Sequence, residues 1–352
     1  MNKIGTRKKW LIISIGIVML SMIGCSSKYN GNQGNKLEPI SKTAFKLNTM
    51  VTITLYDSTS EEILDGALAV CDKYENIYSR TLETSELYKL NNKTLEKKEG
   101  SKDSYYISDE LTDILEYGLK YSELSGGNFD ITIEPISSLW EFTSEEPFVP
   151  NKDIIKSNLG YVNYKNLSTN NNVVTFNKEN MGIDLGAIAK GYIADRIKDY
   201  LISEGVQSAM INLGGNVLCV GSKTKEVPFN IGIQKPFADR NEIVATMELK
   251  DVSVVSSGIY ERSFTEDGKL YHHILNPSTG YPYDNGLISV TIISDYSVDG
   301  DGLSTSCFAL GLEKGLELIN SLPNTYAVFI TDDYVMHYSE GFHENIKVSE
   351  VE

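Results

Sequence analysis

The 352-residue chain is predicted to adopt an α+β fold. Segments in which apolar and polar residues alternate are interspersed with helical segments, without the regular β-α-β order of a parallel sheet. The alternation is typical of strands in antiparallel sheets that bury one face. The sequence shows no internal repeat. We therefore expect mixed or antiparallel sheets packed against helices.

The expected strands share apolar side chains at every second position. In the first, at residues 45–56, the odd-numbered apolar residues are assigned to one face. The segment 209–220 is expected to be a strand pair or one bent strand around Gly214 and Gly215. The remaining expected strands lie at 173–177, 230–234, 243–249, 252–256, 287–294 and 326–331.

The expected helices share apolar residues at three- and four-residue spacing, with capping residues at their ends. Ser108 can cap one of them, and Gly205 can end another that opens at Asp184. The expected helices cover 61–78, 85–91, 108–124, 184–203 and 303–322.

The N-terminal segment has the composition of an export signal. Four cations among the first nine residues precede an apolar run that is shorter than the ~20 residues of a membrane span. The run ends at Gly24-Cys25 and resembles a bacterial lipobox, although Met22 departs from the usual aliphatic residue. We expect a signal peptide at 1–24 and lipidation of Cys25, with an uncleaved short anchor as the alternative.

Residues 25–42 are rich in Ser, Asn, Gly and Lys and are predicted to be a flexible tether. The folded domain is expected at 43–345, on the outer face of the cytoplasmic membrane. The formal net charge of −16 argues against general nucleic-acid binding. Three further cysteines are scattered in apolar settings without a C-x-x-C motif, so they are expected to be buried hydrophobic residues: Cys71, Cys219 and Cys307.

Asp301 and Thr305 stand four residues apart at the expected start of a helix, so they share one face. A carboxylate and a hydroxyl are hard oxygen ligands of the kind that Mg²⁺ prefers, and a helix N-terminus attracts phosphate. A capping aspartate with a buried threonine is the structural alternative. A calcium loop does not fit, because Phe308 falls where its bidentate acid belongs.

Residues 184–192 read DLGAIAKGY, in which small residues allow a ligand to approach the backbone. Asp184 can accept hydrogen bonds from a ribose, an adenine amino group or a helix start. Lys190 offers a positive charge to a phosphate or carbonyl. The segment is neither a Walker loop nor a Rossmann fingerprint. A helix cap with a surface lysine is the structural alternative.

His273 precedes an Asn-Pro turn and is a candidate general base or hydrogen-bond donor. In an extended segment His272 points the opposite way. One surface histidine and one core histidine would be the structural alternative, and the histidine spacing does not suit zinc. Asn128 and Phe129 follow two glycines, where an aromatic ring can lie on backbone, although such a segment is also ordinary core and turn.

Eight segments occur in a fixed order along the chain. They are LNT at 47–49, SEL at 85–87, GGNFDITIEP at 126–135, DLGAIAKGY at 184–192, NLGG at 212–215, SSGIYER at 256–262, HILNPSTGYP at 273–282 and DGLST at 301–305. Together they resemble the ApbE family of FAD:protein FMN transferases over about residues 43–345. The resemblance implies an ApbE-like α+β fold with two lobes around an FAD cleft.

By this resemblance, Mg²⁺ is bound by the Ala187 main-chain oxygen, Asp301 and Thr305, and the regular helix then begins near Ala189 to leave that oxygen free. The sequence departs from the family at Asn48 and at Asn276, where glycine and aspartate are common, so no catalytic role is assigned to Asn276. The residues implied to contact FAD are Leu47, Asn48, Thr81, Asn128, Phe129, Asp130, Asp184, Lys190 and Leu275.

The implied reaction is Mg²⁺-dependent transfer of the FMN half of FAD onto a Ser or Thr hydroxyl of a secreted or membrane redox protein, with release of AMP. His273 is the candidate to accept the hydroxyl proton, and Asp301 is its rival. Two alternatives remain: an FAD pyrophosphatase that uses water as acceptor, and a non-catalytic FAD-binding lipoprotein.

Overall fold

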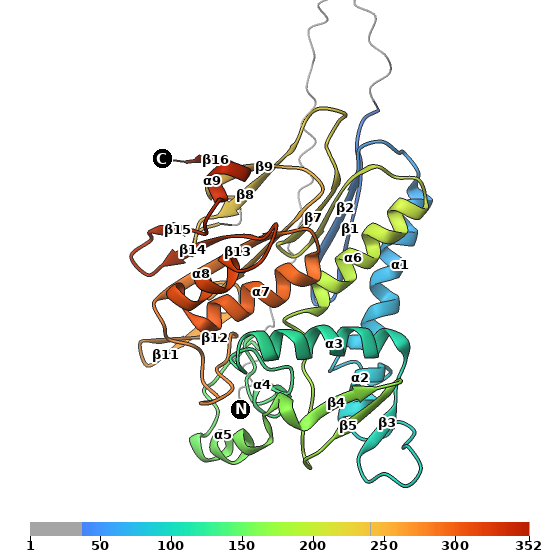
Figure 1. The fold of residues 1–352 in the computed structure, drawn as a ribbon, viewed down its shortest axis with the longest axis vertical. Coiled ribbons are helices and arrows are strands. Elements are labelled where there is room, and N and C mark those ends of the chain that lie inside the picture. Colours follow the sequence, from blue (N-terminus) through green and yellow to red (C-terminus); the bar gives the residue numbers. More distant parts are fainter. Residues whose placement is uncertain (1–36, 240, 352) are drawn as a thin grey trace, which may run out of the picture. The chain divides into compact units, whose positions relative to one another are not determined.

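An eight-stranded antiparallel sheet runs through the computed structural model, which describes residues 37–239 and 241–351 (Figure 1). The predicted signal peptide and Cys25 lie outside the described residues. The strands, in their order across the sheet, are β1 (Ile40–Lys46), β2 (Thr49–Leu55), β6 (Ser208–Leu213), β7 (Asn216–Gly221), β10 (Ser253–Gly258), β13 (Leu287–Ser294), β14 (Tyr326–Thr331) and β15 (Met336–Tyr338).

Three smaller antiparallel sheets accompany it. The first contains β16 (Lys347–Glu350), β9 (Ile243–Leu249) and β8 (Phe229–Gln234); the second contains β3 (Ser104–Tyr106), β5 (Val173–Phe176) and β4 (Leu167–Asn170); the third is the ribbon of β11 (Ser263–Glu266) and β12 (Lys269–His272). The predicted α+β class is confirmed, because the strand pairs are antiparallel and the helices lie outside regular β-α-β units.

Three predicted helices begin and end within one residue of the bounds expected from the sequence. Each begins after a serine whose hydroxyl accepts a backbone N–H three residues later: Ser60, Ser85 and Ser108. The helices are α1 (Glu61–Tyr78), α2 (Glu86–Asn91), α3 (Asp109–Leu124), α4 (Glu134–Ser137), α5 (Lys152–Asn158), η1 (Leu159–Tyr161), η2 (Tyr164–Asn166), α6 (Ala189–Ser203), α7 (Ser297–Leu310), α8 (Leu312–Asn320) and α9 (Phe342–Asn345).

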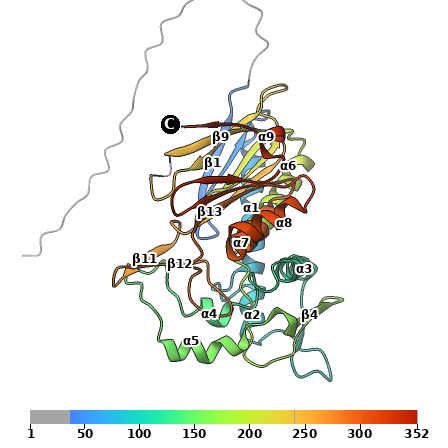
Figure 2. The same cartoon turned by 60° about the vertical axis from the view of Figure 1, so that its left-hand side comes forward.

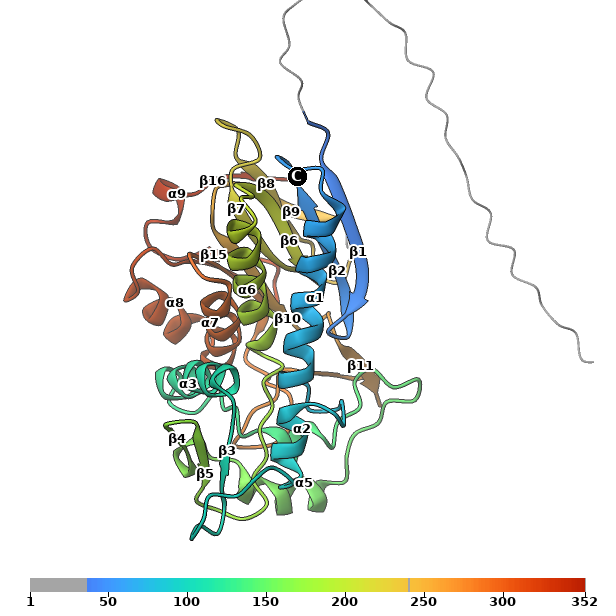
Figure 3. The same cartoon turned by 90° about the vertical axis from the view of Figure 1, so that its right-hand side faces the viewer.

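Both faces of the large sheet are buried. Helices α1 and α6 lie side by side over one face, and α7 and α8 continue this layer (Figures 2 and 3). The sheet of β8, β9 and β16 contributes to a second core on the other face. Alternate residues of β14 divide between the two cores: Phe329 packs toward the helices and Val328 toward the smaller sheet.

The described residues from Leu37 onward cluster as one compact unit. Tyr105 of β3 and Phe176 of β5 belong to the same hydrophobic core as Val51 of the large sheet. The unit extends beyond the predicted domain of 43–345 at both ends, because β1 begins at Ile40 and β16 pairs with β9. No helix among residues 37–239 and 241–351 is long and apolar enough to cross a membrane.

The prediction of a single strand at 45–56 was wrong. The segment is a hairpin, in which Leu47 and Asn48 form the turn between β1 and β2 with φ of 54° and 55°. The apolar alternation continues across the turn, so it did not mark the reversal of the chain. Phe45, which was assigned to the same face as Val51, is 68% exposed, whereas Val51 is buried.

Two helix bounds were also wrong. The helix predicted to open at Asp184 begins at Ala189, after a turn in which the Ala189 N–H donates to the Leu185 carbonyl. The helix predicted at 303–322 starts earlier, at Ser297, and is divided by Gly311, whose φ is 81°. Asp301 therefore lies in the second turn of α7 and not at its start.

Candidate functional site

A cavity of about 850 Å³ opens at one end of the large sheet. The turns that join β1 to β2 and β6 to β7 lie at this end, with the last residues of β10. The volume is within the range of small-molecule sites, roughly 300–1,000 Å³. Every described residue that the sequence assigns to FAD, to the metal or to catalysis lines this cavity.

The junction of α6 and α7 places Asp301 in the cavity wall. A Cβ on Gly191 would collide with the Ser297 carbonyl, so the glycine permits the close approach of the two helices. The Gly191 N–H donates to Asp301 Oδ2 at 2.5 Å, and Asn216 Nδ2 donates to Asp301 Oδ1 at 3.0 Å. Burial raises the pKa of Asp301, and the charge of Lys190 opposes that rise.

The Ala187 carbonyl lies just before α6. Gly191 would be its partner in a regular helix, but the Gly191 N–H bonds Asp301 instead. Among the described residues, no backbone N–H outside the regular helices and strands donates to the Ala187 oxygen. The start of α6 at Ala189 therefore agrees with the helix start that a free Ala187 oxygen requires.

Thr305 lies one turn after Asp301 on α7, as the four-residue spacing predicts. Its hydroxyl is 3.3 Å from Ser257 Oγ, which also lies 2.8 Å from Ser304 Oγ. Ser257 belongs to β10, so the strand and the helix meet at the cavity wall. Thr305 and Asp301 thus present oxygen atoms from one helical face.

The N-terminus of α7 is not available to a phosphate, contrary to the sequence-based prediction. Asp195 of α6 accepts the Ser297 N–H at 2.8 Å and the Val298 N–H at 2.9 Å. The carboxylate therefore occupies the first donors of the helix. Burial raises the pKa of Asp195 to about 6, although these two hydrogen bonds lower it.

The donor set fits Mg²⁺. No group of three or more His, Cys, Asp or Glu side chains suited to a metal occurs in the part of the chain that the structure describes. Three of the residues that line the cavity, Asp301, Thr305 and Ala187, can instead contribute a carboxylate, a hydroxyl and a main-chain carbonyl. Mg²⁺ uses few protein oxygens and takes its other ligands from water and phosphate, so such a set is sufficient.

Asp184 fixes the turn before α6. Its Oδ1 accepts the Gly186 N–H at 2.9 Å, and its Oδ2 lies 2.6 Å from Ser137 Oγ and 3.1 Å from Arg80 Nε. Arg80 also lines the cavity and was not predicted as a site residue. The ion pair has no local sequence signal, because it joins positions more than a hundred residues apart.

Asp130 holds a loop in place. The side chain is only 7% exposed. Its Oδ1 accepts the Thr132 N–H at 2.8 Å and the Thr132 hydroxyl at 2.6 Å. Its Oδ2 accepts the Tyr164 N–H at 2.8 Å. Burial raises its pKa, and these bonds lower it. The neighbouring Asn128 carbonyl accepts the Tyr283 hydroxyl at 2.9 Å. These bonds connect loops from both sides of the cavity.

His273 and His272 point in opposite directions, as expected for an extended segment. His272 is buried with Nε2 2.8 Å from the Tyr283 carbonyl, whereas His273 lines the cavity. His273 Nδ1 is buried and has no hydrogen-bond partner among the described residues. Burial, followed by the charges of Arg262, His272 and Lys190, lowers the pKa of His273 to about 3. The imidazole is therefore neutral at neutral pH.

The sequence departures from the family pattern have local explanations. Asn48 has a φ of 55°, a conformation in which asparagine commonly replaces glycine. Asn276 Oδ1 accepts the Ser278 N–H at 2.8 Å within the turn, and its carbonyl accepts the Gly280 N–H. Asn276 therefore shapes the loop after His273. Thr81 and Leu275 complete the predicted wall at other points of the cavity.

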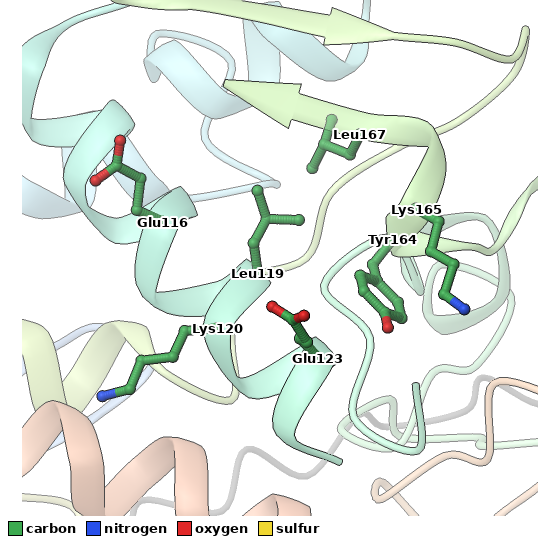
Figure 4. Close-up of a pocket in the computed structure, with 7 residues that line it drawn as sticks. All are labelled: Glu116, Leu119, Lys120, Glu123, Tyr164, Lys165 and Leu167. Carbon is green, nitrogen blue, oxygen red and sulfur yellow. The ribbon is translucent and has the colours of Figure 1, made fainter. Parts of the chain in front are cut away.

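A second hollow, of about 510 Å³, lies between α3 and β4 (Figure 4). Leu119 and Leu167 line it together with Tyr164, and its charged residues alternate in sign. It contains none of the residues assigned to FAD, the metal or catalysis. The chemistry that the sequence predicts is therefore gathered in the larger cavity.

The fold and the cavity define an α+β protein whose cleft suits an anionic ligand held with a hard divalent cation. The model of the ApbE family matches residues 47–330, and the chain belongs to this family. An FAD:protein FMN transferase of Klebsiella pneumoniae (strain 342) is 34% identical over 293 residues, which cover 83% of this chain and 89% of that protein. Another, of Treponema pallidum, is 29% identical, with 95% of each chain covered.

Solved structures agree with this assignment. The ApbE protein of Thermotoga maritima superimposes with a TM-score of 0.78 at 30% identity, covering 87% of this chain and 99% of that one. The flavinyl transferase ApbE of Pseudomonas stutzeri, in its apo form, has a TM-score of 0.75 at 27% identity, covering 87% and 96%. The ApbE-like fold predicted from the sequence is confirmed.

Proposed function

We propose that this protein is an FAD:protein FMN transferase, which moves the FMN half of FAD to a hydroxyl of an acceptor flavoprotein. The observation that carries the proposal is the direct contact between two distant segments: the Gly191 N–H bonds Asp301, 110 residues away, in the wall of the cavity that Ala187 also lines. The family membership and the names of the relatives support the same activity.

In the proposed reaction, a Ser or Thr oxygen of the acceptor forms a bond to the FMN phosphorus, and the bond from that phosphorus to the bridging oxygen breaks. AMP leaves with the bridging oxygen, and the hydroxyl proton moves to His273. Mg²⁺ held by Ala187, Asp301 and Thr305 would neutralise charge on the diphosphate. Asp301 is the less suitable proton acceptor, because both its oxygens already accept protein hydrogen bonds and it is proposed to bind the metal.

Two cations are placed to bind the diphosphate. Lys190 and Arg262 line the cavity, and the charges of both act on His273. Arg262 makes no ion pair with another residue in the described ranges 37–239 and 241–351. A free guanidinium is suited to phosphate oxygens. Positioning and charge neutralisation would provide most of the rate enhancement.

The test is incubation of the purified protein with FAD, Mg²⁺ and a candidate acceptor flavoprotein, followed by intact-mass spectrometry. The transferase proposal expects an acceptor that is heavier by one FMN group, together with stoichiometric AMP. FMN and AMP without an adduct would indicate the pyrophosphatase. Intact FAD that stays bound in the presence of Mg²⁺ would indicate a flavin carrier.

We also propose that the protein is exported and lipid-anchored through Cys25. The cationic start, the short apolar run and the Gly24-Cys25 junction support the proposal. Growth with labelled palmitate should label the unchanged protein and not the Cys25→Ala variant. Equal labelling of the two proteins would contradict the proposed anchor.

A further inference from the structure

We infer that Asn216 is a positioning residue that holds the Asp301 carboxylate in the orientation required by the metal. The inference rests on the proposed metal site. Asn216 begins β7, directly after the two-glycine turn, and is 1% exposed. Its Nδ2 donates to Asp301 Oδ1 at 3.0 Å, and its Oδ1 accepts the Ser297 hydroxyl at 2.8 Å.

The amide group determines the direction of both bonds. A carboxylate only accepts hydrogen bonds and a serine hydroxyl can donate, so the asparagine must turn its NH₂ toward Asp301 and its oxygen toward Ser297. The carboxylate therefore fixes the orientation of the amide, and the serine hydroxyl, which can donate or accept, follows it. Since all three side chains are almost fully buried, water does not compete for these bonds.

The other oxygen of Asp301 is fixed by the Gly191 N–H at 2.5 Å. Each carboxylate oxygen thus accepts one protein hydrogen bond from a different segment, which removes rotation about the last side-chain bond. Each oxygen retains a further lone-pair direction that can face a cation. Groups that orient a metal ligand in this way typically change metal affinity about 10- to 100-fold when removed.

The Gly191 bond also couples two of the proposed ligands. Because this N–H binds Asp301, it does not bind Ala187, and α6 begins only at Ala189. Rotation of the Asp301 carboxylate would release the Gly191 N–H to the Ala187 carbonyl. Asn216 therefore supports the Ala187 oxygen indirectly, through the position of Asp301.

The experiment compares Asn216→Ala with a matched control, Ser297→Ala. Both variants lose the hydrogen bond between Asn216 and Ser297, but only Asn216→Ala loses the donor to Asp301. Mn²⁺ replaces Mg²⁺ as the probe, and its affinity is measured by electron paramagnetic resonance with FAD present. Thermal midpoints report the structural effect of each substitution.

We expect Asn216→Ala to weaken Mn²⁺ binding about tenfold or more. Ser297→Ala should keep an affinity close to that of the unchanged protein while losing comparable thermal stability. The Mg²⁺ concentration for half-maximal AMP release should rise in Asn216→Ala alone. Restoration of most of the rate by saturating Mg²⁺ would agree with an effect on positioning.

Equal Mn²⁺ affinity in Asn216→Ala and the unchanged protein would overturn the inference, as would equal weakening in both variants. If Asn216→Ala folds poorly, Asn216→Ser replaces it in the experiment, because the shorter serine side chain does not reach Asp301 as the amide does. Unchanged Mn²⁺ affinity in Asn216→Ser would overturn the inference in the same way. Failure of the unchanged protein to bind Mn²⁺ would overturn the proposed metal site itself, which separates the two failures.

Discussion

The Asp301 end and the His273 end of the cleft differ in how their polar groups are satisfied. At the Asp301 end, the buried carboxylate has a protein donor on each oxygen. At the His273 end, the buried Nδ1 has no hydrogen-bond partner and Arg262 no ion-pair partner among the described residues. An unpaired buried polar group such as His273 Nδ1 destabilises a fold, so it persists where a ligand supplies the partner. Arg262 is exposed at the cavity, where its guanidinium can meet a ligand.

The contrast assigns different tasks to the two ends. The protein itself fixes the oxygens around Asp301, as a metal site requires. The charges around His273 remain available, as the binding of a diphosphate and the acceptance of a proton require. Lys190 connects the two ends, because its charge lowers the pKa of both Asp301 and His273.

The largest effect is expected from Asp301→Ala, which removes the only carboxylate among the proposed metal ligands. Mg²⁺-dependent release of AMP from FAD, measured by chromatography, should fall at least about 100-fold. The matched control is Asp299→Ala. Asp299 contacts Lys120 and Tyr121 on α3, away from the cavity wall, so AMP release should be largely retained. Near-normal release from Asp301→Ala would contradict the metal assignment.

The next largest effect is expected at the other end, from His273→Ala. Loss of a general base should lower the rate of FMN transfer about 10²- to 10⁴-fold, while FAD affinity changes little. His272→Gln is the neighbouring control: it disturbs the bond to the Tyr283 carbonyl and should lower the melting temperature without removing transfer. Equal losses of transfer in the two variants would show that His273 has no special role.

A smaller effect is expected from Arg262→Ala. Removal of the Arg262 guanidinium should weaken FAD binding about tenfold and reduce its dependence on salt. Quenching of flavin fluorescence during titration measures both. Arg262→Lys should retain part of the affinity, and Lys269→Ala, in the ribbon that follows Arg262, should retain all of it. If Arg262→Ala binds FAD as tightly as the unchanged protein, the guanidinium does not contact the diphosphate.

The smallest expected effect is on the pKa of His273. Burial and nearby cations hold it at about 3, below the ordinary 6.5, so the unfolded chain takes up a proton first as the pH falls. The contribution of the neutral His273 ring to the free energy of unfolding is therefore fully present above pH 6.5, and it is lost as the pH falls toward 3. Arg262→Ala removes one cation and should raise this pKa, although burial keeps it below 6.5. NMR titration of the His273 ring resonance measures the change; no change would place Arg262 too far away.

The sequence predicted the elements that depend on local interactions. Helices α1, α2 and α3 match because a serine precedes each one and because their apolar residues recur at helical spacing. Strands β9, β13 and β14 match because each segment is rich in the β-branched and apolar residues that favour strands. The turn at Leu47 was missed, since a leucine with positive φ is uncommon and the alternation continues through it.

The candidate site divides in the same way. The spacing of Asp301 and Thr305 identified one helical face, and the order of the segments identified the family. The capping of α7 by Asp195 had no local signal, because the two partners are 102 positions apart. The same holds for the support of Asp301 by Asn216 and of Asp184 by Arg80.

The sequence by itself therefore determined which chemical groups this protein possesses and which local elements carry them, since periodicity, capping and spacing act within a few turns of chain. Only the tertiary structure decided which oxygens are free and which are already bonded. That distinction depends on contacts such as Gly191 with Asp301, which form only when distant segments are buried together and each polar group must find a partner.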